Sequence, residues 1–136
     1  MKRIIPFLII VCSATVTILA ADAALPPPVA REVNYSKDVK PILAQHCYKC
    51  HANEKLEAKL DMRTRESFLK GGEDGVVIVV GKSADSEVIK RVTSKDADRM
   101  PRKSDPLMAD DISILRAWID QGFKWDDAGA KDTEKK

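Results

Sequence analysis

The chain has few of the side chains that hold structural metal ions: three cysteines and two histidines among 136 residues. A structural zinc site needs four ligands, most often thiolates and imidazoles. We expect Cys12 to be removed with an N-terminal segment, which leaves only Cys47 and Cys50 as thiols. The sequence therefore argues against a structural zinc site. It also lacks the βαβ pattern that surrounds the Cys-x-x-Cys pair of a thioredoxin-like protein.

The chain also lacks an excess of charge of either sign. Its formal net charge is +2, and removing residues 1–23 takes away two basic residues and one acidic residue, which leaves +1. Proteins that bind nucleic acids carry a basic patch that neutralises phosphates. We therefore expect no nucleic-acid partner.

The N-terminus has the pattern of a secretory signal peptide. Lys2 and Arg3 precede an apolar run over residues 4–21, and Ala21-Asp22-Ala23 fits the small-x-small cleavage rule. The alternative is an uncleaved membrane anchor, because about 18 apolar residues nearly span a bilayer. Three hydroxyl side chains interrupt the run and the cleavage site favours removal. We interpret residues 1–23 as a signal peptide and expect a periplasmic protein, which contacts a membrane only if this segment is retained.

The most informative feature that is present is Cys47-Tyr48-Lys49-Cys50-His51, a C-x-x-C-H attachment sequence of c-type haem. Two thiols three residues apart can add to the two vinyl groups of one porphyrin, and the adjoining imidazole can bind the iron. On a helix that turns about 100° per residue, Cys50 lies about 60° behind Cys47 and His51 about 40° ahead of it. One turn can therefore attach one haem c through Cys47 and Cys50 and ligate its iron through His51. Export supports this interpretation, because haem is attached outside the bacterial cytoplasm.

The spacing of apolar residues predicts a small all-α domain. A helix capped by Ser36 or Asp38 leads to the motif, and a second runs from Thr64 through Leu69 to Gly71. A third is expected over residues 83–93, and a last one from Asp110 to Gly122 that packs on the helix before the motif. Four helices around one covalent haem would form a cytochrome c-like fold.

The rest of the chain is predicted to be extended or disordered. Residues 24–32 form a Pro-rich linker, the domain occupies residues 33–125, and residues 126–136 form a charged, disordered tail. Val76 to Val80 is β-branched, but a lone segment of five residues has no strand to pair with. We predict that it is a buried extended connection.

The second axial ligand of the iron separates an electron carrier from a haem enzyme. His46 neighbours Cys47 and is tied to the same haem face as His51, so it cannot reach the opposite side. The remaining soft ligands are Met62, Met100 and Met108. Met100 lies in a loop beside a stiffening proline, whereas Met62 suits a core position and Met108 a helix start. Met100 is the preferred candidate.

Several segments resemble the planctomycete-type cytochrome c domain over roughly residues 33–125. The resemblance begins with Val33 to Leu43 and the C-x-x-C-H motif. It continues through residues 60–66, Val80-Gly81-Lys82-Ser83, Arg99-Met100-Pro101 and Trp118-Ile119-Asp120-Gln121-Gly122. It implies a class I-like helical fold with thioethers at Cys47 and Cys50, proximal His51 and distal Met100. This chain differs from the family at Arg102, where a second proline is common, and at Met108-Ala109, where the last helix often begins Thr-Pro.

The sequence thus predicts a periplasmic monohaem cytochrome that carries single electrons between redox protein partners and is not an enzyme. Iron with both axial positions filled has no open site for a substrate. Lysines near the motif, such as Lys49 and Lys55, are candidates for steering an acidic partner. Two alternatives remain: a haem enzyme or a gas or redox sensor with a labile distal position, and a haem-free dithiol redox protein.

Overall fold

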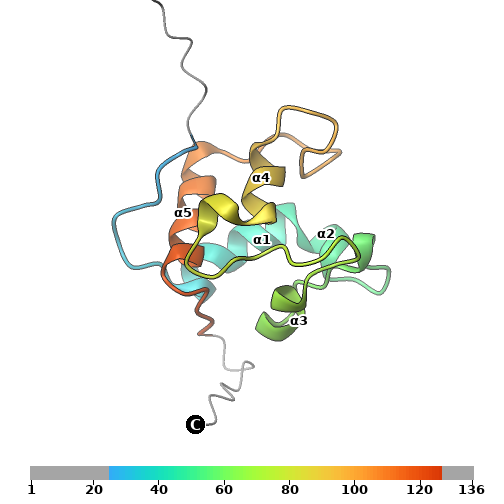
Figure 1. The fold of residues 1–136 in the computed structure, drawn as a ribbon, viewed down its shortest axis with the longest axis horizontal. Helices are drawn as coiled ribbons and strands as arrows, with labels where there is room; N and C mark the ends of the chain where they lie inside the picture. Colours follow the sequence, from blue (N-terminus) through green and yellow to red (C-terminus); the bar gives the residue numbers. More distant parts are fainter. Residues whose placement is uncertain (1–24, 127–136) are drawn as a thin grey trace, which may run out of the picture.

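The computed structural model describes residues 25–126, so the predicted signal peptide and residues 127–136 of the predicted tail lie outside the described residues. Within that range the fold is helical, with five α-helices and no strand, as predicted for a small all-α domain (Figure 1). The α-helices are α1 (Lys40–His46), α2 (Tyr48–His51), α3 (Arg65–Lys70), α4 (Glu87–Thr93) and α5 (Ala109–Asp120). Three shorter helical segments join them: η1 (Tyr35–Val39), η2 (Glu57–Lys59) and η3 (Ser83–Asp85).

The helix before the motif begins earlier and with a different cap than predicted. Asn34, rather than Ser36 or Asp38, is the N-cap, and its side chain accepts a hydrogen bond from the amide of Lys37. The carboxylate of Asp38 in turn accepts a hydrogen bond from the amide of Asn34 at 2.8 Å. The first turn is a π-helix, η1, and α1 follows without a break. Pro41 occupies the first turn of α1, a position at which proline is common.

The predicted helix from Thr64 to Gly71 is confirmed with both of its end signals. Thr64 and Ser67 form a reciprocal capping box, in which each side chain accepts from the other residue's backbone N–H. Gly71 ends α3 at φ 83°, a conformation that favours glycine. The cap and the glycine thus fix both ends of a short helix that buries Phe68.

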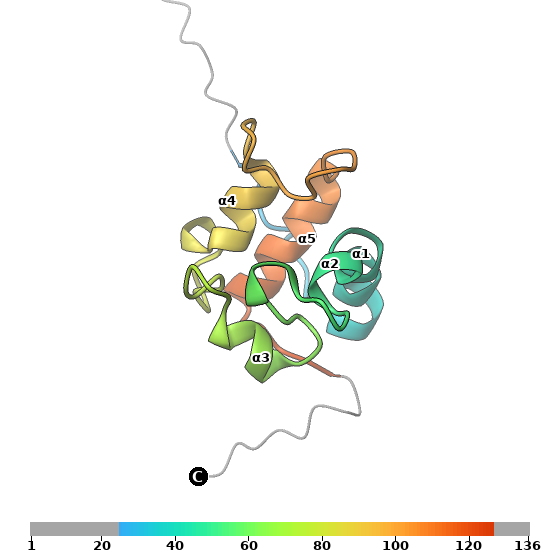
Figure 2. The same cartoon turned by 90° about the vertical axis from the view of Figure 1, so that its right-hand side faces the viewer.

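Helix α5 is the centre of the domain. It packs against η1, η3 and α4, so the prediction that the last helix packs on the helix leading to the motif is confirmed through η1. Figure 2 shows α5 in the centre, with α4 to its left, α2 to its right and α3 below. The aromatic side chains of the core gather at its C-terminal end, where Tyr35 stacks on Trp125 at a ring distance of 3.9 Å. The other members of this aromatic cluster are Phe68, Trp118 and Phe123.

Residues 25–32 of the predicted Pro-rich linker have no helix or strand and lie along α5. The amide of Val29 donates to the carbonyl of Ser113 at 3.2 Å, and the Arg116 guanidinium donates to the carbonyl of Pro26. Further along, the Gln121 side chain donates to the carbonyl of Arg31 at 2.7 Å. The linker is therefore held on the domain by hydrogen bonds of its own backbone, one to the backbone of α5 and two to the side chains of Arg116 and Gln121.

Two details of the middle of the chain differ from the predictions. The segment Val76 to Val80 is a connection without helix or strand, and only part of it is buried. Ile78 is 3% exposed, whereas Val76 is 63% and Val80 45% exposed. The helix predicted over residues 83–93 is divided into η3 and α4 at Ser86, whose hydroxyl donates to the carbonyl of Lys82. Local propensity identified both segments, but which side chains are covered depends on tertiary packing.

Candidate haem-attachment site

The C-x-x-C-H motif forms one tight helical turn at the junction of α1 and α2. Cys47 ends α1 and precedes α2, and its carbonyl accepts from the amides of Cys50 at 3.1 Å and His51 at 3.0 Å. These hydrogen bonds place the two cysteines and the histidine on one turn, as the spacing predicted. The motif is a turn of its own rather than the end of the preceding helix.

The two thiols of this turn lie in different environments. Both are free cysteines, Cys47 half-buried and Cys50 exposed. Burial, together with the neighbouring Cys50, raises the pKa of the Cys47 thiol to about 12. A dithiol redox catalyst instead uses a lowered thiol pKa. The environment of Cys47 thus differs from that of a reactive dithiol.

His51 carries a buried ring nitrogen that lacks a partner. The residue is 9% exposed, and its Nδ1 makes no hydrogen bond to any of the residues in the described range. A buried polar atom without a partner is costly, so such atoms mark places where a group binds or a proton is held. The carbonyl of His51 accepts from the amide of Met62 at 2.8 Å, which fixes the backbone of the turn. A turn with two thiols and a buried imidazole fits covalent attachment and ligation of a haem.

Tyr48, inside the motif, connects the turn to the aromatic cluster. Its hydroxyl lies 2.9 Å from the hydroxyl of Tyr35 on η1, and Tyr35 in turn stacks on Trp125. The sequence analysis did not identify this contact, because Tyr35 and Tyr48 are 13 residues apart on different elements. No local pattern indicates such a pair.

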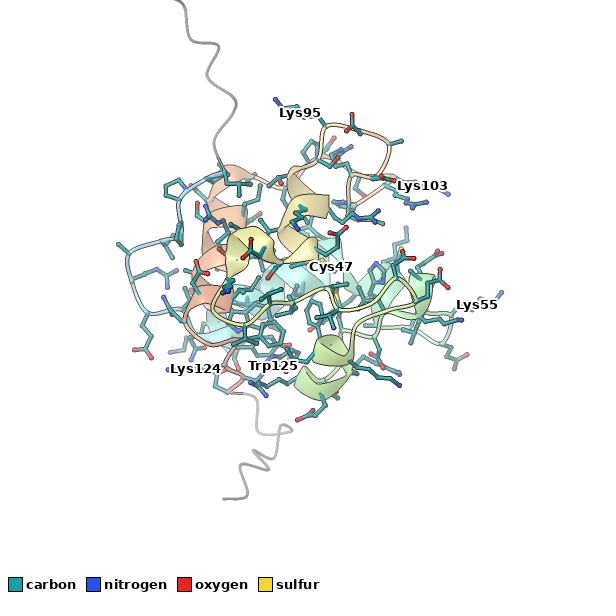
Figure 3. All side chains as sticks on the ribbon, in the orientation of Figure 1. Cys47, Lys55, Lys95, Lys103, Lys124 and Trp125 are labelled. Atoms are coloured by element: carbon teal, nitrogen blue, oxygen red, sulfur yellow. The ribbon has the colours of Figure 1, made fainter. Side chains whose placement is uncertain are left out.

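Met100, the preferred distal candidate, comes from the loop that joins α4 to α5. It is half-buried and packs against the core, and its amide donates to the carbonyl of Arg91 at 2.9 Å. The Met100–Pro101 peptide is cis. This loop and α2 lie on the same side of the molecule, at the right in Figure 1 and facing the viewer in Figure 2. Figure 3 shows that Lys103 of this loop and Lys55 after α2 project outward on that side, whereas Lys95 projects from the top of the loop.

The structure also places the other two methionine candidates and His46. Met62 is 3% exposed and belongs to the core, and Met108 is 69% exposed at the start of α5. Nε2 of His46 lies 3.8 Å from a carboxylate oxygen of Asp111, in the first turn of α5. His46 therefore contacts α5.

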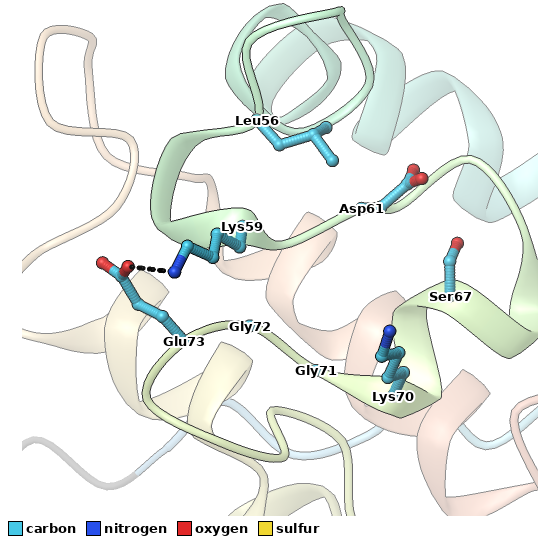
Figure 4. A pocket seen from close by; sticks show the side chains of 8 residues that line it. All are labelled: Leu56, Lys59, Asp61, Ser67, Lys70, Gly71, Gly72 and Glu73. Carbon is cyan, nitrogen blue, oxygen red and sulfur yellow. Dashed lines mark ion pairs between the residues drawn. The ribbon is translucent and has the colours of Figure 1, made fainter.

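A separate hollow of about 360 Å³ lies between η2 and the glycines after α3. Figure 4 shows Lys59 pairing with Glu73 across its mouth, at 3.9 Å, while Lys70 and Asp61 line its sides. None of the four candidate haem residues lines this hollow. Elsewhere within residues 25–126, no group of three or more His, Cys, Asp or Glu side chains is placed to hold a metal ion.

Comparison with known protein families identifies the domain. A family model described as Planctomycete cytochrome C matches residues 47–104, from Cys47 through Met100. Residues 47–104 match a planctomycete-type cytochrome c domain. Such a domain implies a haem-binding, electron-transfer protein with covalently bound haem c. Searches of curated proteins and of solved structures gave no match.

The planctomycete-type cytochrome c match begins at Cys47, so η1 and α1 precede it and α5 follows it. Both flanking parts nonetheless contribute to the same core as the matched segment. Among residues 25–126 no helix has the length and apolar character needed to cross a bilayer.

Proposed function

We propose that this protein is a periplasmic monohaem cytochrome that carries single electrons between redox protein partners, with one haem c held by Cys47 and Cys50 and ligated by His51 and Met100. The observation that supports it best is the motif turn, where two free thiols and a buried imidazole share one helical turn inside the family match. When bound, the haem iron supplies one-electron oxidation and reduction without bond formation to a substrate. The residues of the chain hold, orient and cover it.

Proximal ligation by His51 is supported by its burial and its backbone. Its imidazole is already desolvated, and the hydrogen bond from the Met62 amide to its carbonyl limits rotation of the turn. One ring nitrogen can bind iron while the other donates to a hydrogen-bond partner, which fixes the tautomer.

Distal ligation by Met100 is supported by elimination and by its loop. The backbone of Met62 is hydrogen-bonded to the backbone of His51, the proposed ligand of the opposite side, which argues against Met62. The side chain of Met108 is exposed to solvent, which argues against Met108. Met100 comes from a different element, and the bond from its amide to the Arg91 carbonyl fixes the backbone that presents the thioether. A thioether ligand favours ferrous iron and raises the reduction potential relative to a second imidazole.

Two spectra of the holoprotein test this proposal. The pyridine haemochrome spectrum of periplasmic protein is expected to show a c-type haem, which Cys47→Ala with Cys50→Ala removes; a protein without that signal overturns haem binding. The ferric methionine-to-iron charge-transfer band is expected in wild type and lost in Met100→Ala. Met62→Leu is the matched control and should retain the band. Persistence of the band in Met100→Ala would reject Met100, and its absence from wild type would indicate the open distal position of a haem enzyme or sensor.

A further inference from the structure

The loop that carries Met100 is fastened to α4 at Arg91. The carbonyl of Arg91 lies in the last turn of α4, where helical carbonyls have no partner within their own helix. It accepts a hydrogen bond from the amide of Met100 at 2.9 Å. Figure 1 shows this loop leaving α4 and folding back before it reaches α5. The backbone of the proposed distal ligand is therefore held by the helix that precedes it.

The side chain of Arg91 reaches the same loop. Its Nη1 lies 3.7 Å from a carboxylate oxygen of Asp98, two residues before Met100. Its Nε donates to a carboxylate oxygen of Glu87 at 2.6 Å. Glu87 lies one helical turn earlier on α4, so this bond fixes the direction of the planar guanidinium. Arg91 thus holds the loop twice, through its backbone at Met100 and through its side chain at Asp98.

The residue between these two attachment points closes the loop on itself. Both Nη atoms of Arg99 donate to the carbonyl of Ser104 at 3.3 Å, and the amide of Arg99 donates to the carbonyl of Asp96 at 3.1 Å. These contacts stiffen the loop but do not join it to α4. Within the described part of the chain, the hydrogen bond and the ion pair that do join it to α4 both end on Arg91.

The two attachment points act together because one residue separates them. An ion pair as exposed as Arg91–Asp98 contributes little by itself, since the carboxylate side chain is 73% exposed. A single hydrogen bond at Met100 would let the chain pivot about it. With Asp98 also held, the backbone around Met100 has fewer conformations to lose when its amide bonds to the helix.

We propose that Arg91 is a positioning residue for the distal ligand: its guanidinium, oriented by Glu87 and paired with Asp98, keeps the Met100 loop closed on α4 and so limits how readily the thioether leaves the iron. This inference rests on the proposed function, because it takes Met100 as the ligand. Arg91 acts through Met100 and is not itself a ligand, since a guanidinium stays protonated and offers no acceptor.

The test uses imidazole as a competitor of Met100 in the ferric holoprotein. Imidazole binds the iron only after the thioether has left it, so its apparent affinity rises by the factor by which the loop opens more often. Asp98→Asn is expected to raise that affinity about two- to fivefold, and Arg91→Met at least as much. Asp98→Glu keeps the carboxylate and should remain near wild type. Loss of the methionine-to-iron charge-transfer band follows each titration.

Matched controls separate the loop attachment from charge and from overall stability. Lys103→Met removes one positive charge from the same loop, and Arg31→Met removes an arginine from its ion pair with Asp38. Both controls are expected to bind imidazole as wild type does. Hydrogen exchange of the Met100 amide, followed by NMR, should be faster in Arg91→Met and unchanged in the two controls.

The outcomes distinguish this inference from the ligand assignment. Equal imidazole affinities in wild type, Arg91→Met and Asp98→Asn overturn the role of Arg91, while the charge-transfer band of wild type still supports Met100. An increase as large in Lys103→Met as in Arg91→Met also overturns it, because charge alone would then explain the effect. A wild type without the band overturns the ligand assignment and this inference with it. If Arg91→Met does not fold, Asp98→Asn decides, because that side chain is 73% exposed.

Discussion

The hydroxyl of Tyr48, between the two cysteines of the attachment turn, lies 2.9 Å from the hydroxyl of Tyr35, which is 2% exposed on η1. Tyr35 also contacts two indoles, stacking on Trp125 and lying 5.6 Å from Trp118 of α5 between ring centroids. The turn proposed to hold the haem is thus tied by one hydrogen bond to the aromatic cluster. We expect this bond to orient the turn.

Removing either hydroxyl should destabilise the holoprotein. Tyr35→Phe and Tyr48→Phe are each expected to lower the free energy of unfolding by about 1 kcal/mol, because each breaks the same hydrogen bond. The double variant should cost less than the sum of the two single variants. A denaturant double-mutant cycle measures this coupling, and strictly additive costs would show that the two hydroxyls do not interact in solution.

Replacing Met100 by histidine should lower the reduction potential. An imidazole in place of a thioether favours ferric iron, and the shift should be a fraction of the roughly 0.8 V range that axial ligands span. Spectroelectrochemical titration of wild type and Met100→His gives the difference. Met108→His is the control, because its side chain is 69% exposed, and an equal shift in both variants would contradict Met100 as a ligand.

Two glycines with similar φ angles should respond differently to substitution by alanine. A Cβ at Gly71, where φ is 83°, would overlap the carbonyl oxygen of Gly75, whereas a Cβ at Gly81, where φ is 78°, meets nothing within 4 Å. Gly81→Ala should cost about 1–2 kcal/mol for the left-handed backbone alone. Gly71→Ala should cost several kcal/mol, since the backbone around Gly75 must also move. Thermal unfolding followed by circular dichroism compares the two, and equal costs would contradict the close approach at Gly71.

The Arg31–Asp38 pair should stabilise the protein only above acidic pH. The hydrogen bond from the Arg31 guanidinium, followed by the one from the Asn34 amide, lowers the pKa of Asp38 below its usual 3.8. A carboxyl group with a lowered pKa contributes stability above 3.8, and this contribution is lost as the pH falls through its pKa in the folded state. The denaturation midpoints of wild type and Asp38→Asn should therefore differ at neutral pH and converge in acid. Asp105→Asn serves as an exposed control, and a gap that widens in acid would contradict the sign.

The parts of the fold that the sequence predicted well depend on local chemistry. The helix from Thr64 to Gly71 has a cap, an apolar residue and a glycine within one short segment, and the structure confirms all three. The last helix likewise has acidic residues in its first turn and an apolar stripe. The motif turn followed from the spacing of its cysteines, because helical geometry alone places Cys47, Cys50 and His51 together.

The parts that the sequence did not predict depend on contacts between distant residues. Asn34 became the cap because its side chain, and not that of Ser36, reaches the amide of Lys37; the Ser36 amide and hydroxyl instead donate to Asp126. The segment of residues 76–80 was predicted to be buried because all five residues are hydrophobic. Of the five, only Ile78 is buried. Burial depends on which elements pack over a segment, and propensity carries no information about that.

The docked linker has a consequence for how the domain can move. The root-mean-square distance between the ends of a flexible segment is about 5–6 Å times the square root of its length in residues. Residues 26–33 do not behave as such a flexible segment, because they are hydrogen-bonded to α5 and its C-cap residue Gln121. These hydrogen bonds involve Pro26, Val29, Arg31 and Val33. The backbone therefore leaves the domain at one defined point near Leu25. The position of Leu25 relative to the attachment turn is therefore set by the surface of α5 and not by a freely moving segment.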